Sequence, residues 1–150
     1  MAAHKVLCTI GSSQKSLRQF IQLLQSAGVT KVIDVRLHNT SQLAGFSKKE
    51  DLAFILESFG IGYEHVPDLA PTDEVIKAFK KVDKDWPVFE RAVNGLLEER
   101  QAEKLWTSPV FASPVPCLLC AEHEADHCHR RLVAEHFRRT DPDLEIRHLT

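Results

Sequence analysis

Five short apolar runs alternate with segments whose apolar residues recur at helical spacing, and this alternation constrains the fold of the 150-residue chain most strongly. Apolar runs of this length, bounded by Gly, Pro or polar residues, are typical of buried strands. Strands that alternate with helices predict βαβ units, a parallel sheet and right-handed crossovers. The expected strands are Lys5–Ile10, Lys31–Arg36, Ile61–Val66, Val115–Ala121 and Leu144–Leu149.

Two segments combine a capping pattern with apolar residues at helical spacing and a final glycine. Ser16-Leu-Arg-Gln19 and Ser47-Lys-Lys-Glu50 both have the hydroxyl and the later Gln or Glu of a capping box. Gly28 and Gly60 follow where the helical spacing ends, and glycine suits the residue just beyond a helix. Further helices are predicted over residues 75–82, 89–97 and 132–137.

These elements predict a single α/β domain over residues 1–150. We expect a Rossmann-like three-layer sandwich with a mostly parallel sheet of about five strands. The expected strand order is 3-2-1-4-5, which places the switch point between the first and fourth strands. Ligands of open parallel sheets bind beyond the carboxyl ends of the strands near such a point, so we expect a site at that rim.

Composition excludes some classes of protein. The chain is 43% apolar and 27% charged, as in ordinary globular domains, and its net charge of −2 does not suggest a strongly basic nucleic-acid-binding protein. No apolar run approaches the ~20 residues of a membrane helix, and no apolar secretory signal follows Met1. We therefore expect a cytoplasmic protein, not bound to membranes, whose four cysteines are reduced.

The densest group of reactive side chains lies between Cys117 and Arg130, a segment with three cysteines, three histidines, three acids and one arginine. An apolar run precedes it and helical spacing follows, so we expect a strand, a polar turn and a helix. Two other polar groups lie at the carboxyl ends of predicted strands, Ser12 just after the first strand and Asp34 with Arg36 at the end of the second. The residues expected together at the rim are Ser12, Asp34, Arg36, Glu122 and Arg130.

Five motifs spread over nearly the whole chain fit one known family. They are Thr9-Ile-Gly-Ser12, Asp34-Val-Arg36, Phe46-Ser47, Gly60-Ile-Gly-Tyr63, and Cys120-Ala-Glu122 with Cys128-His-Arg130. On these motifs the chain resembles the family called domain of unknown function 488. The resemblance implies a small intracellular α/β domain and no defined reaction. Two positions depart from the family pattern, because Ser12 replaces a usual His and Asn39 a usual Pro. If that His is a catalytic base in relatives, this chain lacks it.

Our first hypothesis is an enzyme, a hydrolase or group transferase acting on an anionic, phosphate-bearing small molecule or nucleotide. In it Glu122 is a general acid or base and Asp34 orients a partner, while Cys128, at a helix start, is a candidate nucleophile. Each role has a structural alternative, namely an ion pair with arginine for the acids and simple packing for the cysteine. The expected substrate-binding residues are Ser12, Arg36, Tyr63, His129 and Arg130.

Two further hypotheses remain open. A strip of arginines on the last helix, Arg130, Arg131, Arg138 and Arg139, would suit a nucleic-acid or nucleotide binding module without catalysis. Cys117, Cys120, Cys128 and His129 have the residue types of a zinc site, but residues three apart in a strand point to opposite faces. A looser metal site from Cys120, Glu122, His127 or His129 is also conceivable. We assign no metal at this stage, and the sequence indicates no cofactor or oligomeric state.

Overall fold

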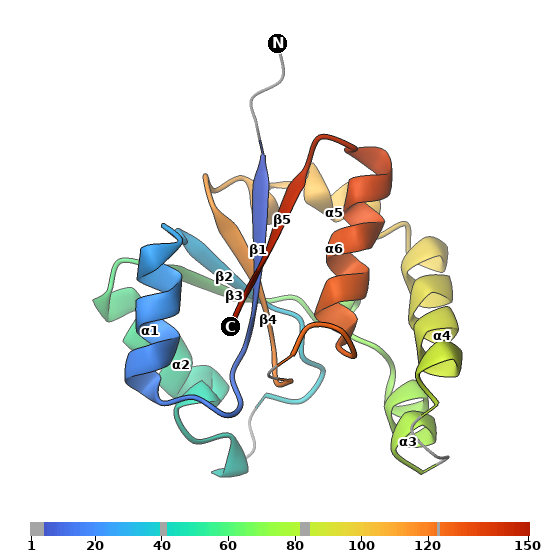
Figure 1. Cartoon of the computed structure of the whole chain (residues 1–150), viewed down its shortest axis with the longest axis horizontal. Coiled ribbons are helices and arrows are strands. Elements are labelled where there is room, and N and C mark those ends of the chain that lie inside the picture. Colours follow the sequence, from blue (N-terminus) through green and yellow to red (C-terminus); the bar gives the residue numbers. More distant parts are fainter. Residues whose placement is uncertain (1–4, 40–41, 82–84, 123) are drawn as a thin grey trace.

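The computed structural model describes residues 5–39, 42–81, 85–122 and 124–150. In this part of the chain, five parallel strands form one sheet between two layers of helices (Figure 1). The predicted three-layer α/β fold is therefore confirmed. The strands are β1 (Val6–Gly11), β2 (Lys31–Asp34), β3 (Gly62–His65), β4 (Pro116–Cys120) and β5 (Glu145–Leu149).

The order of the strands is β3-β2-β4-β1-β5, so the predicted order 3-2-1-4-5 is wrong. β4 lies between β1 and β2, with Gly11 opposite Cys120 and Asp34 opposite Leu119. All five residues of β4 are buried, as expected for a strand at the centre of a sheet that is covered on both faces. The carboxyl end of β4 is thus the middle of the edge at which open parallel sheets commonly bind ligands.

Helices cover the two faces of the sheet unequally (Figure 1). α1 (Leu17–Ser26) and α2 (Lys49–Ser58) pack on one face, and the four later helices lie on the other. These later helices are α3 (Asp73–Lys81), α4 (Trp86–Glu99), α5 (Glu103–Trp106) and α6 (His129–Thr140). Short 3₁₀ helices occur at η1 (Gln42–Ser47), η2 (Pro67–Leu69) and η3 (Pro109–Phe111). Within the described residues, none of the helices combines the length and apolarity needed to cross a bilayer.

Alternation along β4 divides its side chains between the two apolar cores. Cys117 and Leu119 belong to the core under α1 and α2, whereas Leu118 and Cys120 belong to the core under α4 and α6. The expectation that Cys117 and Cys120 point to opposite faces is confirmed. A zinc site that uses both cysteines is therefore excluded by the position of Cys117.

The capping patterns and glycines in the sequence predicted some helix ends correctly and one incorrectly. The capping box at Ser16 is confirmed, since its hydroxyl accepts the Gln19 N–H at 3.1 Å and the Gln19 side chain accepts the Ser16 N–H at 2.8 Å. Gly28 and Gly60 both adopt φ +72° just beyond their helices. The capping box at Ser47 is wrong: α2 begins one residue later, with Lys48 as N-cap and no side-chain cap bond.

Candidate functional site

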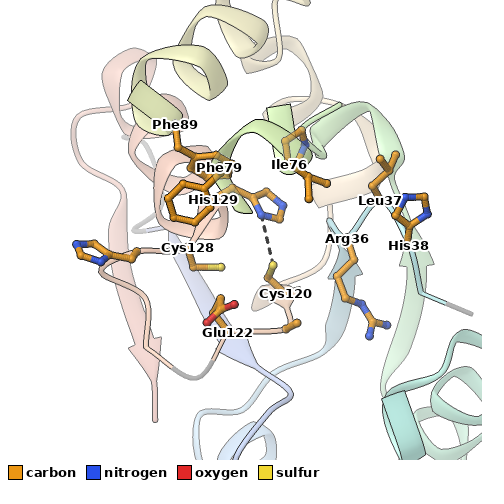
Figure 2. A pocket seen from close by; sticks show the side chains of 13 residues that line it. Arg36, Leu37, His38, Ile76, Phe79, Phe89, Cys120, Glu122, Cys128 and His129 are labelled. Atoms are coloured by element: carbon orange, nitrogen blue, oxygen red, sulfur yellow. Dashed lines mark hydrogen bonds between the residues drawn. The ribbon is translucent and has the colours of Figure 1, made fainter. Parts of the chain in front are cut away.

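A cavity of about 500 Å³ opens at the carboxyl end of β4, beside α3, α4 and the first turn of α6 (Figure 2). Its lining divides into an apolar part and a polar part. Most of the apolar part comes from loops and helices that follow β2 and β3, and it includes Leu37, Pro71, Ile76, Phe79 and Phe89. The polar part comes mainly from the segment after β4, and it includes Cys120, Glu122, His127, Cys128 and His129.

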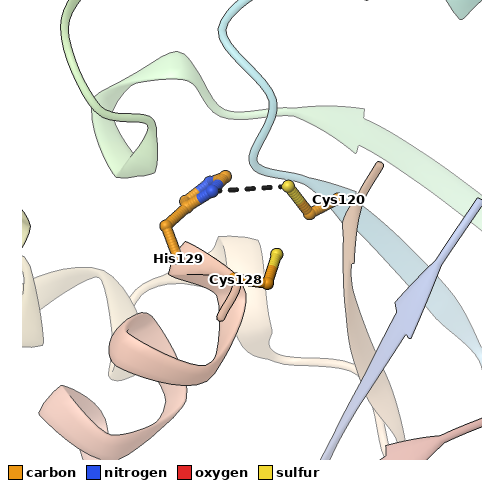
Figure 3. A group of neighbouring side chains, drawn as sticks. All are labelled: Cys120, Cys128 and His129. Atoms are coloured by element: carbon orange, nitrogen blue, oxygen red, sulfur yellow. Dashed lines mark hydrogen bonds between the residues drawn. The ribbon is translucent and has the colours of Figure 1, made fainter. Parts of the chain in front are cut away.

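Cys120, Cys128 and His129, which all line this cavity, form a compact buried group (Figure 3). Cys120 ends β4, Cys128 is the N-cap of α6, and His129 is the first residue of that helix. The two sulfur atoms and a ring nitrogen of His129 all lie within 4.8 Å of one another. The turn between strand and helix therefore brings three potential ligands or reactive groups together.

The orientation of the His129 ring follows from its two partners. Nε2 lies 2.7 Å from the carbonyl oxygen of Val35, and because a carbonyl can only accept, Nε2 carries the hydrogen. Nδ1 then faces Cys120 Sγ at 3.3 Å with its lone pair when the ring is neutral. The backbone that follows β2 thus fixes the imidazole with Nδ1 turned toward the cysteines.

The two thiols of the group differ in acidity. The Cys128 thiol, as a donor to Cys120, lowers the Cys120 pKa, and backbone N–H groups and the positive charge of Arg130 add to this effect against the opposing cost of burial. The same bond to Cys120, together with burial, raises the pKa of Cys128 well above its usual value. Cys120 is therefore the more acidic of the pair, although Cys128 was the residue selected from the sequence.

Asp34 does not line the cavity, so the prediction that it joins Glu122 at one rim is wrong. It projects toward the α1 and α2 face, where it is fully buried. Arg36 donates to both its oxygens, Nε at 2.8 Å and the terminal nitrogen at 2.7 Å, and Tyr63 donates its hydroxyl at 2.6 Å. Asn39 adds a bond at 3.1 Å. Asp34 therefore forms a buried ion pair with Arg36, which was the structural alternative to its catalytic role.

Titration of this network follows from its hydrogen bonds. Burial alone would raise the pKa of Asp34, but the bonds from Arg36, Tyr63 and Asn39 outweigh burial and hold this pKa below its usual value. Burial and the bond to Asp34 raise the pKa of Tyr63. Tyr63 therefore stays a hydrogen-bond donor to Asp34, and it lies outside the cavity that it was expected to line.

Arg36 and Arg130 also differ from their predicted roles as anion ligands. Arg36 belongs to the lining, but its guanidinium turns away from Cys120 and His129 (Figure 2) and also bonds the Ser47 carbonyl oxygen at 2.7 Å. Arg130 is fully buried and donates to the Thr9 hydroxyl at 3.3 Å and to the Glu122 carbonyl oxygen at 2.5 Å. Both arginines hold the protein chain in place around the cavity.

Of the other predicted residues, Glu122 reaches the cavity and Ser12 does not. β4 ends at Cys120, so Glu122 lies in the turn, with its side chain exposed at the cavity. Ser12 does not line the cavity and binds the end of β4 through its backbone, with its N–H donating to the Cys120 carbonyl oxygen at 3.0 Å.

The arginine strip expected on the last helix is interrupted. Arg130 is buried, and Arg131 lies 3.5 Å from a Glu90 oxygen and 5.6 Å from the centre of the Trp86 ring. Arg139 pairs with Glu98 at 3.7 Å. Arg131 and Arg139 therefore belong to a surface of ordinary ion pairs, and Arg130 is buried, so the strip does not form a continuous site for nucleic acid.

Comparison with known proteins gives a family. The model described as Domain of unknown function DUF488 matches residues 16–137, which is most of the chain. The chain belongs to this family. The match extends from the first turn of α1 into the last turn of α6 and includes Cys120, Cys128 and His129. No curated protein and no solved structure matches the chain.

Two features of this DUF488 site were not found from the sequence. One is the apolar wall from α3 and α4, together with the stacking of Trp86 on His127 at a ring distance of 4.9 Å. The other is the group of Cys120, Cys128 and His129 without Cys117. Strand alternation, which excluded Cys117, left these three residues as a set, but their spacing in the sequence did not show that they meet.

Proposed function

We propose that this DUF488 protein is an enzyme, a hydrolase or group transferase, whose reaction takes place in the cavity at the end of β4. One observation carries the proposal: a buried Cys/His group and an exposed carboxylate open on the same, mainly apolar cavity. Enzyme sites commonly combine apolar walls with a few convergent polar groups. The cavity also lies where open parallel sheets bind their ligands.

Glu122 is the proposed general acid or base. Its side chain lies at the cavity and is exposed, so it can exchange protons with solvent and with a bound substrate. Cys128 and His129 line the same cavity from the start of α6, and Cys120 adds the more acidic thiol. Asp34 and Arg130 support the site from outside the cavity through their buried bonds.

The proposed substrate remains a small anionic molecule, with phosphate esters and nucleotides as the first class to test. The apolar wall formed by Ile76, Phe79 and Phe89 suits a ring or another apolar part of such a molecule. Because Arg36 and Arg130 are bound to protein groups, the contacts to the anion are assigned to the first turn of α6 and to His127.

The test compares Glu122→Gln with Glu124→Gln, a carboxylate of the same turn that is exposed and does not line the cavity. Turnover is measured with 4-nitrophenyl phosphate, 4-nitrophenyl acetate and nucleoside 5′-monophosphates. We expect Glu122→Gln to lower turnover of the accepted probe by about 10²–10⁴-fold, the usual contribution of a general acid or base. The melting temperature should stay unchanged because the side chain is exposed.

Glu124→Gln should keep the wild-type rate. Equal rates for wild type and both variants would contradict the role of Glu122. Failure of the wild-type protein to turn over any of these probes, together with no binding of nucleotides in calorimetry, would contradict the proposed function as a whole.

A further inference from the structure

We infer that Cys120, Cys128 and His129 bind one zinc-type divalent metal ion, with a fourth coordination position open to the cavity. The binding itself is a property of these three side chains. Its use in hydrolysis rests on the proposed function, because the same cavity would hold the substrate. The family match assigns no role to this Cys/His group, and the proposed general acid or base is Glu122, so metal binding is a separate role for the three residues.

The distances suit such an ion. Zinc binds sulfur at about 2.3 Å and imidazole nitrogen at about 2.0–2.1 Å, so tetrahedral ligand atoms lie roughly 3.5–3.8 Å apart. Cys120 Sγ and His129 Nδ1 are 3.3 Å apart, and every pair in the group, Cys128 Sγ included, is within 4.8 Å. Changes of side-chain torsion angles that move an atom by about 1 Å or less would therefore place all three on one ion.

The imidazole is already oriented as a ligand. Metal-bound histidines usually donate their second ring N–H to a carbonyl or carboxylate, which fixes the tautomer and the ring plane. His129 has this arrangement, with Nε2 bonded to the Val35 carbonyl oxygen at 2.7 Å and Nδ1 facing the cysteines. Val35 follows β2 next to the central strand, so the supporting oxygen belongs to the rigid part of the fold.

The types of ligand and their surroundings indicate which ion and which kind of site. Two thiolates and one imidazole favour zinc over magnesium or calcium, which prefer oxygen ligands. Structural zinc sites usually have four protein ligands, whereas catalytic sites have three and leave one position open. Cys117 cannot be the fourth ligand because it lies in the opposite core, and the three residues line a cavity. An ion there could activate a water molecule close to Glu122.

The first experiment uses the full chain, purified under reducing conditions without added metal, and measures its metal content. The protein is then stripped with a chelator and titrated with Co²⁺, whose spectrum reports the ligands. We expect one equivalent to bind with sulfur-to-cobalt charge-transfer bands and tetrahedral visible bands, and Zn²⁺ to displace it. Bound metal should also raise the melting temperature.

Variants assign the ligands. Cys128→Ala and His129→Ala should each lower Co²⁺ affinity by more than about a hundredfold, since even supporting residues of metal sites commonly contribute 10–100-fold. Cys8→Ala and Cys117→Ala are matched controls, because both cysteines are buried in the opposite core, and they should keep the full spectrum. Circular dichroism of each metal-free variant checks folding. Cys128→Ser replaces Cys128→Ala if that variant fails to fold, and His129→Gln replaces His129→Ala in the same way.

The outcomes separate this inference from the proposed function. Absence of charge-transfer bands in the wild type, or their loss in Cys117→Ala but not in Cys128→Ala, would overturn the metal site. Turnover that persists after the metal is stripped, together with the absence of a cobalt spectrum, would support the proposed enzyme but overturn the metal site. The cysteine thiols would then act without a metal ion. A cobalt spectrum that depends on Cys128 and His129, with neither turnover of any probe nor nucleotide binding in calorimetry, would support the metal site and overturn the enzyme.

Discussion

Substitution of Asp34 by Asn should greatly destabilise the protein. The carboxylate is fully buried and accepts two bonds from the Arg36 side chain, one from the Arg36 backbone N–H, one from Tyr63 and one from Asn39. An asparagine has nearly the same shape but no charge, so Arg36, only 6% exposed, would remain as a buried cation without its counterion. Breaking a buried ion pair from one side costs about 3–5 kcal/mol. For a domain of this size that loss lowers the melting temperature by roughly 6–20 °C.

The assay is urea denaturation of wild type and Asp34→Asn across a range of pH. In the folded protein the pKa of Asp34 is held below its usual value, so its stabilising contribution is complete above the unfolded pKa of about 3.9. The contribution is lost as pH falls through the lower, folded pKa. We therefore expect the wild-type advantage to be constant near neutral pH and to shrink in acid below about pH 4.

Asp73→Asn is the control, because its pair with His38 at 2.6 Å is exposed and should contribute little to stability. The reasoning would be refuted if Asp34→Asn had the same free energy of unfolding as wild type. Unchanged stability together with lost turnover would instead assign Asp34 the catalytic role expected from the sequence.

Two further predictions concern single groups. Tyr63→Phe removes the hydroxyl that donates to Asp34 at 2.6 Å and should cost about 1.5–3 kcal/mol in urea denaturation, while shifting acid unfolding to higher pH; an unchanged acid midpoint would count against the hydrogen bond. Gly60→Ala should cost about 1–2 kcal/mol in thermal denaturation because φ is +72° there, whereas Gly95→Ala, inside α4, should stabilise by about 0.5–1 kcal/mol. Equal effects of both glycine substitutions would contradict the conformational explanation.

Those features of the fold that depend on residues close together in the sequence could be predicted. Ser16, Gly28 and Gly60 act within one helix turn, and the structure has them where the pattern placed them. Ser47 has an equally good local pattern, but its hydroxyl and carbonyl oxygens accept bonds from Arg36, which is eleven residues earlier in the chain. A distant partner thus displaced the local one, and no short-range rule could show this.

The position of the site could be predicted from the sequence, but only some of the residues that form it could. Alternation within β4 correctly separates Cys117 from Cys120, because both belong to one strand. The face of Asp34 relative to Cys120 depends on the register between β2 and β4, in which Asp34 is opposite Leu119. That register requires the strand order, and the order depends on packing across the whole sheet. The position of the apolar wall from α3 and α4 also depends on the strand order.

The central position of β4 has a consequence for how the molecule assembles during synthesis. β1 pairs only with β4 and β5, and β2 pairs only with β3 and β4, among the described strands. A nascent chain that ends before residue 116 therefore contains the β2–β3 pair and a β1 strand without a partner in the sheet, with nothing to join them. The last quarter of the chain closes the fold and carries the reactive residues in the same step, so a partly made chain presents no half-formed pocket to the cell.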